Sequence, residues 1–147
     1  MKKRILLFCA VFVLILSGCS FKVRQDTFYI PEEKVESIVF QKKYVKDDGS
    51  FYYCQKLVAE REEIEEFCDK IRYLDAKKAS YENAYPIKEY PVIIILKGAK
   101  DHKLILTEEV AFFDQIPYVY TKDGVYSDFL KLYDDMDYPE EETKPNP

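Results

Sequence analysis

The chain of 147 residues carries 22 basic and 27 acidic side chains, which gives a formal net charge of −5. This length is typical of one domain, and the acidic balance without clustered Lys and Arg argues against binding to nucleic acid. One histidine, four glycines and four widely spaced cysteines supply no zinc-ligand pattern, Gly-rich phosphate loop or G-x-S-x-G elbow, so no metal and no cofactor is expected.

The N-terminus has the pattern of a secretory signal. Basic residues at positions 2–4 precede an apolar run over residues 5–16. That run is too short to cross a bilayer as a helix, which takes roughly 20 apolar residues. It leads into the sequence Leu-Ser-Gly-Cys at residues 16–19, in which an aliphatic residue and two small residues precede a cysteine.

This segment resembles the lipobox of bacterial lipoproteins, and the resemblance covers about the first twenty residues. It implies cleavage before Cys19, attachment of a diacylglyceryl group to the Cys19 thiol and a second acylation, for example with palmitate. Two or three acyl chains anchor a protein stably, because each buried CH₂ contributes roughly 0.8 kcal/mol. We therefore expect a signal peptide over residues 1–18, a tether over residues 19–28 and a location on the extracytoplasmic face of the cell membrane. The alternative is an ordinary secretory signal followed by a chance cysteine.

Removal of the signal makes the protein more acidic. Three basic residues leave with it, so 19 basic side chains face 27 acidic ones and the mature chain has a net charge of −8. This charge disfavours adhesion to anionic lipid head groups beyond the lipid anchor itself. Acidic residues crowd the C-terminus, and we expect residues 139–147 to form a disordered acidic tail.

Residues 29–138 are expected to form a single α+β domain built on an antiparallel sheet of about five strands. Two strand-like runs, at residues 35–45 and 51–58, flank an Asp-Asp-Gly-Ser turn and predict a hairpin. A helix is predicted over residues 60–74. Its apolar residues at helical spacing are Ile64, Phe67, Cys68, Ile71 and Leu74.

The second half of the domain predicts a β-meander and a closing helix. Strands are expected at residues 92–96 and 103–107, with one or two more over residues 110–120. The closing helix has apolar residues at Tyr126, Phe129, Leu130, Tyr133 and Met136. This order of elements resembles small lipoprotein domains of unassigned function in Gram-positive bacteria, and such a resemblance implies no activity.

A long loop is predicted over residues 75–91, with Tyr81, Tyr85 and Tyr90 at no regular spacing. Loops of this length inside a domain usually bind something or fold over the core. Tyrosines suit contact surfaces because each has a large rigid ring with a polar tip. Two interpretations stay open: the tyrosines form a binding loop, or their rings cap the sheet.

Two cysteines remain once the signal is removed and Cys19 carries lipid. A disulfide between Cys54 and Cys68 could persist outside the cytoplasm and would contribute on the order of 3 kcal/mol. The alternative is that both are free, buried side chains that pack as small hydrophobes.

The sequence favours a non-catalytic binding module of the cell envelope, whose partner is an envelope protein, a peptide or a wall component. The alternative is a small extracytoplasmic hydrolase that uses two carboxylates, with Glu108 and Glu109 as the only acid pair close to a strand end. His102, the single histidine, is expected to be a solvated turn residue beside Asp101.

The lipid anchor leads to the first testable prediction. Cys19→Ala removes the thiol that would receive the lipid, so it should leave an uncleaved and unlipidated precursor. Metabolic labelling with a palmitate analogue should tag the wild-type protein and miss the variant. Equal labelling of the two proteins would rule out lipidation at Cys19.

Overall fold

The computed structural model describes residues 35–80 and 90–144. Over these residues the chain forms one antiparallel sheet and two helices, which confirms the α+β class, but the sheet has eight strands and not about five. The strands are β1 (Val35–Val45), β2 (Phe51–Val58), β3 (Ala76–Lys78), β4 (Val92–Gly98), β5 (His102–Leu106), β6 (Val110–Phe113), β7 (Ile116–Tyr120) and β8 (Glu141–Thr143). The helices are α2 (Arg61–Arg72) and α3 (Val125–Asp135).

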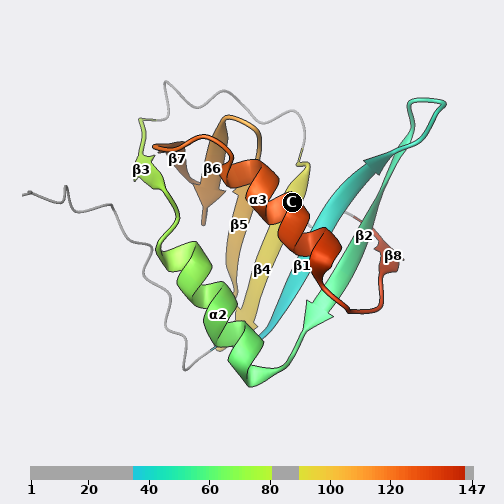
Figure 1. The fold of residues 1–147 in the computed structure, drawn as a ribbon, viewed down its shortest axis with the longest axis horizontal. Coiled ribbons are helices and arrows are strands. Elements are labelled where there is room, and N and C mark those ends of the chain that lie inside the picture. The colour runs from blue at the N-terminus through green and yellow to red at the C-terminus, as the bar shows by residue number, and fades with distance from the viewer. Residues whose placement is uncertain (1–34, 81–89, 145–147) are drawn as a thin grey trace, which may run out of the picture.

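Both helices cross the same face of the sheet (Figure 1). The strand order is β3-β7-β6-β5-β4-β1-β2-β8. Helix α2 therefore carries the chain from β2, next to one edge, to β3 at the other edge. Strands β4 to β7 then form a meander back toward β3, and α3 returns the chain to β8 at the first edge. The two helices consequently run in opposite directions across the sheet.

Strand β1 lies near the middle of the sheet and pairs with both β2 and β4. Alternate residues of β1 face opposite sides, as in any strand. Ile38 and Phe40 are fully buried on the helix-covered face, whereas Val39 packs against a smaller apolar cluster that contains Ile93 and Ile95. The continuous apolar run of β4 is thus buried on both faces, which explains why it shows no alternation.

The main core forms between the sheet and the two helices. It includes Ile94 of β4 and Phe67 of α2. Phe40 is the central contact, because its ring meets Phe67 edge-on at a centroid distance of 5.7 Å and Tyr133 of α3 at 5.1 Å.

Two strands were not expected from the sequence, and both lie at the edges of the sheet. β3 falls within residues 75–91, expected to be a loop, and pairs with β7. β8 falls within residues 139–147, where a disordered tail was expected, and pairs with β2. Each has three residues, too few for a periodic pattern; β3 is also held by Ala76, which is buried in the main core. The prediction of a disordered tail is therefore wrong for Glu141–Thr143.

The core position of Ile94 gives a prediction on stability. Ile94→Ala leaves a cavity between β4 and the helices and should lower the free energy of unfolding by about 2–5 kcal/mol. Leu57→Ala is the matched control, because Leu57 is 51% exposed, and it should change stability by no more than about 0.5 kcal/mol. Urea titration measures both. Equal losses for the two variants would contradict the placement of β4 at the centre of the core.

Candidate functional site

Several residues singled out in the sequence lie outside the described part of the chain. These are Cys19, Tyr81 and Tyr85, so the lipid site and most of the tyrosine loop stay predictions. Neither described helix is long and apolar enough to cross a membrane.

Tyr90, the third tyrosine of the predicted loop, is half-buried. Its ring packs against the apolar cluster of Tyr53, Ile93 and Ile95 on the sheet face opposite the helices. For this residue the structure therefore favours the sheet-capping interpretation over the binding-loop interpretation.

Cys54 and Cys68 are free, buried thiols in this structure, so the disulfide that the sequence left open is not formed. Cys68 packs in the main core, where burial raises its pKa to about 11. Burial, followed by the charges of Glu140 and Glu142, also raises the pKa of Cys54. Both thiols stay protonated at neutral pH, and a protonated thiol is a poor nucleophile for disulfide exchange.

Glu108 and Glu109 lie in the turn between β5 and β6 and line a cavity of about 790 Å³ that reaches the N-terminal end of α3. Tyr120 and Tyr126 line the same cavity. Both glutamates are exposed, whereas a carboxyl that acts as a general acid usually sits in a desolvated pocket. The arrangement therefore gives little support to a two-carboxylate active site.

His102 is not the solvated turn residue expected from the sequence. It begins β5, stacks on the ring of Phe113, and has its Nδ1 atom 2.6 Å from Oδ2 of Asp114. The other oxygen of Asp114 accepts a hydrogen bond from the Lys103 backbone amide at 2.9 Å. Asp114 and Gln115 have positive φ in the turn between β6 and β7. The His102–Asp114 pair thus ties this turn to β5, and neither residue lines a described cavity.

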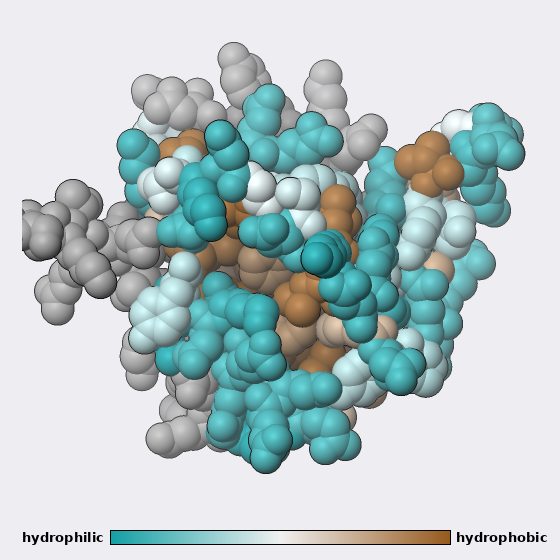
Figure 2. All heavy atoms as spheres, in the orientation of Figure 1, coloured by the Kyte–Doolittle hydropathy of each residue, from teal (hydrophilic) through white to brown (hydrophobic). Residues whose placement is uncertain are grey.

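A groove between α2 and α3 is a further concave surface, which the sequence did not predict. It comprises two adjoining cavities of about 500 Å³ and 330 Å³, both lined by Lys70, Leu132 and Asp135. Phe129 lines the larger cavity and Phe67 the smaller one, and both side chains also belong to the core. Figure 2 shows this floor as hydrophobic surface bordered by hydrophilic side chains of the helices.

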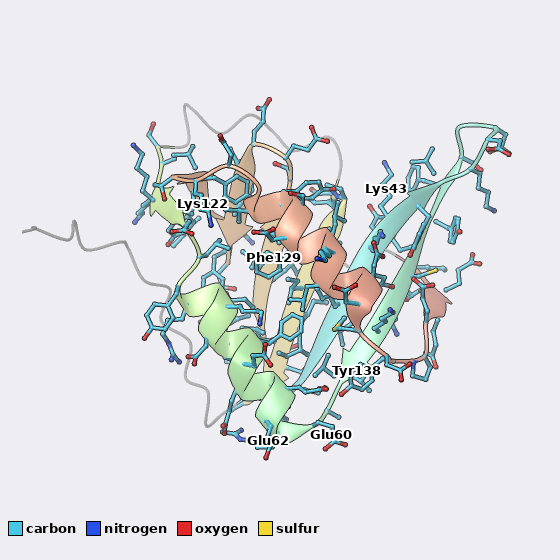
Figure 3. All side chains as sticks on the ribbon, in the orientation of Figure 1. Lys43, Glu60, Glu62, Lys122, Phe129 and Tyr138 are labelled. Atoms are coloured by element: carbon cyan, nitrogen blue, oxygen red, sulfur yellow. The ribbon has the colours of Figure 1, made fainter. Side chains whose placement is uncertain are left out.

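The two ends of the inter-helix groove differ in charge. Because the helices run in opposite directions, the N-terminal half of α2 faces the C-terminal end of α3. Four carboxylates and one lysine line this acidic end: Glu63, Glu66, Asp135, Asp137 and Lys70. The other end is mixed: besides Lys70 and Asp135, which both cavities share, it is lined by Lys122, Lys131, Asp75 and Asp128. In Figure 3, Tyr138 marks the acidic end and Lys122 the mixed end.

The C-terminal end of α3 carries two carboxylates where the helix dipole is negative, which is an unfavourable position for an anion. Asp134 is compensated by Lys42, whose Nζ atom lies 2.6 Å from its carboxylate. Asp135 faces the groove. Within residues 35–80 and 90–144, neither Asp135 nor Asp137 has an ion-pair partner.

A buried lysine holds this end of α3 on the sheet. Lys56 of β2 is only 8% exposed, and its ammonium group donates hydrogen bonds of 2.8 Å to the backbone carbonyls of Tyr133 and Met136. These carbonyls lie in the last turn of the helix and at its C-cap, which lack intrahelical donors. The positive charge of Lys56 also offsets the negative end of the helix dipole.

Glu140 adds a second link between α3 and the sheet. Its carboxylate accepts hydrogen bonds of 2.8 Å from the hydroxyls of Tyr44 in β1 and Tyr133 in α3. Burial, followed by the hydrogen bond to Glu140, raises the pKa of both tyrosines, so both phenols stay protonated donors. This network fixes one wall of the groove.

Within the described residues, no cluster of three or more His, Cys, Asp or Glu side chains could hold a metal ion. No protein-family model, curated protein or solved structure matches the chain.

The sequence contained two signals for the groove. Leu132, three residues after Phe129, widens the apolar stripe of this helix beyond Phe129 and Tyr133, and a pair of aspartates ends the helix against its dipole. Neither signal shows that α2 lies opposite, because that depends on how the helices cross the sheet.

The role of Lys56 can be tested directly. Lys56→Met keeps most of the aliphatic stem but removes both hydrogen bonds to the end of α3, so it should lower the free energy of unfolding by about 1.5–3 kcal/mol. Lys100→Met, in the exposed turn between β4 and β5, is the control and should have almost no effect. Urea titration compares the two. A Lys56→Met protein as stable as the wild type would show that the ammonium does not hold α3.

Proposed function

We propose that the protein is a lipid-anchored lipoprotein of the extracytoplasmic membrane face, and that it acts as a non-catalytic binding module whose contact surface is the inter-helix groove. The observation that carries this proposal is the open apolar floor of the groove. Contiguous apolar surface rimmed by polar residues is characteristic of interaction sites. The anchor part of the proposal rests on the lipobox-like sequence that ends at Cys19.

The shape of the groove favours an elongated ligand. Its two cavities meet at Lys70, Leu132 and Asp135, so one ligand could occupy both along the length of the helices. Each cavity has the volume of an ordinary small-ligand pocket. The floor consists of aliphatic and aromatic side chains, which suits apolar side chains of a protein segment better than the hydroxyl groups of a wall glycan.

The packing of Tyr90 reduces the number of loop tyrosines that are candidates for binding a partner. Tyr81 and Tyr85 stay candidates for a second contact, whereas Tyr90 has a place in the apolar cluster of the opposite sheet face. The hydrolase alternative rests on Glu108 and Glu109 beside their cavity, and their exposure makes it the weaker proposal.

A photo-crosslinking residue placed in the groove tests the proposal in intact membranes. We expect benzoylphenylalanine at Leu132 to give a discrete adduct with a neighbouring protein. The matched probe at Leu57, on the opposite face of the sheet and 51% exposed, should not give it. Adding Met136→Gln, which replaces an apolar side chain of the groove by a neutral polar one of similar length, should strongly reduce the Leu132 adduct.

Thermal melting of each probe protein serves as the control for folding. The same adduct from both probe positions would contradict the proposal, because the contact would then not depend on the groove. An adduct of unchanged yield with Met136→Gln would contradict it for the same reason.

A further inference from the structure

We propose that the groove binds an amphipathic protein segment with a basic end, whose Lys or Arg side chains contact the acidic end of the groove while its apolar side chains lie along the floor. This inference rests on the proposed function and adds the chemistry of the partner. The basic character of the partner is inferred from the negative charges that line the acidic end of the groove.

Three of the five charged groups at the acidic end already have partners within the domain. Lys70 pairs with Glu66, and Glu63 accepts a hydrogen bond from the hydroxyl of Tyr138. Asp135 and Asp137 line the same end without an ion-pair partner among the described residues. They are therefore the carboxylates that an incoming cation would meet.

The helix dipole adds to this negative potential. Asp135 occupies the last position of α3, where the free backbone carbonyls make the helix end negative. Lys56 and Lys42 compensate the side of this helix end that faces the sheet, through the backbone carbonyls and Asp134. Among the described residues, no lysine or arginine forms an ion pair with Asp135: Lys70 is paired with Glu66, and Lys131, which lines the same cavity as Asp135, makes no ion pair with it.

The apolar floor of the groove determines which side chains the rest of the partner segment carries. Leu132 and Met136 are half-buried and Phe67 is 5% exposed, so large apolar side chains can pack there without displacing the core. The flexible thioether of Met136 adapts to side chains of different shapes. At the other end the lysines Lys122 and Lys131 lie among aspartates and favour neither sign of charge strongly.

The same charges disfavour the competing ligands. An acidic peptide or an anionic lipid head group would meet unpaired carboxylates at the acidic end, and like charges brought together oppose binding. An uncharged apolar segment would gain from the floor but would leave Asp135 and Asp137 uncompensated.

A peptide selection on the full lipidated chain in nanodiscs tests the inference without assuming a sequence for the partner. Random 16-residue peptides displayed on phage are selected on the wild-type protein and counter-selected on Leu132→Asn, which removes the apolar side chain without adding a charge. We expect groove-dependent peptides in which Lys or Arg lies next to apolar residues.

The enriched peptides are then titrated against a variant of the acidic end, called the rim variant, and against its charge-matched control. Asp135→Asn with Asp137→Asn should weaken binding by about three- to tenfold at low salt, and the loss should shrink at high salt. Glu36→Gln with Asp47→Asn makes the same change in net charge on exposed residues outside the groove and should leave affinity unchanged. Each rim carboxylate becomes an amide of the same shape, and thermal melting confirms that the variants fold.

The outcomes separate this inference from the proposed function. Groove-dependent peptides that lack basic residues, or an affinity that the rim variant leaves unchanged, would overturn the basic partner while the groove stands as a binding site. Peptides that bind wild type and Leu132→Asn equally, or no enrichment on the wild type, would overturn the groove itself as a peptide-binding site.

Discussion

The positions of both helices depend on one aromatic side chain of β1, the strand that both helices contact. The buried ring of Phe40 contacts Phe67 of α2 and Tyr133 of α3 edge-on. Aromatic pairs of this kind contribute about 0.5–1.5 kcal/mol each beyond the burial of their surface. Because each helix packs against this ring, the helices are held on the sheet side by side and the surface between them stays open. The groove therefore depends on the size of Phe40, whose ring both helices contact.

The second constraint is the attachment of the end of α3. Asp134 and Asp135 place two negative charges at the C-terminal end of α3, where the helix dipole is already negative. Positive groups on other elements must therefore offset this charge. Lys56 does so from β2 by donating to the last carbonyls, and Lys42 does so from β1 through Asp134. The domain thus neutralises the side of this helix end that faces the sheet and leaves the side that faces the groove negative. A local conflict of this kind is more common at functional sites than elsewhere.

The sequence predicted the elements whose side chains show a regular period. The hairpin of β1 and β2 and helix α2 were expected close to their observed bounds because each is long enough for burial to pattern its residues. Strand β4 was expected for a different reason, because its apolar run is continuous. β3 and β8 have no such pattern. The groove was not predicted, because it depends on the distance between two helices that lie far apart in the sequence. Lys56 was missed for a related reason: a charged residue at a core-facing strand position is favourable only when a helix end supplies carbonyls.

The two edge strands affect how copies of the protein meet one another. β3 and β8 offer only three residues each, and their side chains include Lys77, Lys78, Glu141 and Glu142. An open sheet edge is a template on which another chain can add a strand, and short, charged edges limit that addition. A lipid anchor would confine the molecules to a plane, where collisions between neighbours are frequent. Short edges would then keep a crowded layer of anchored molecules from joining edge to edge into continuous sheets.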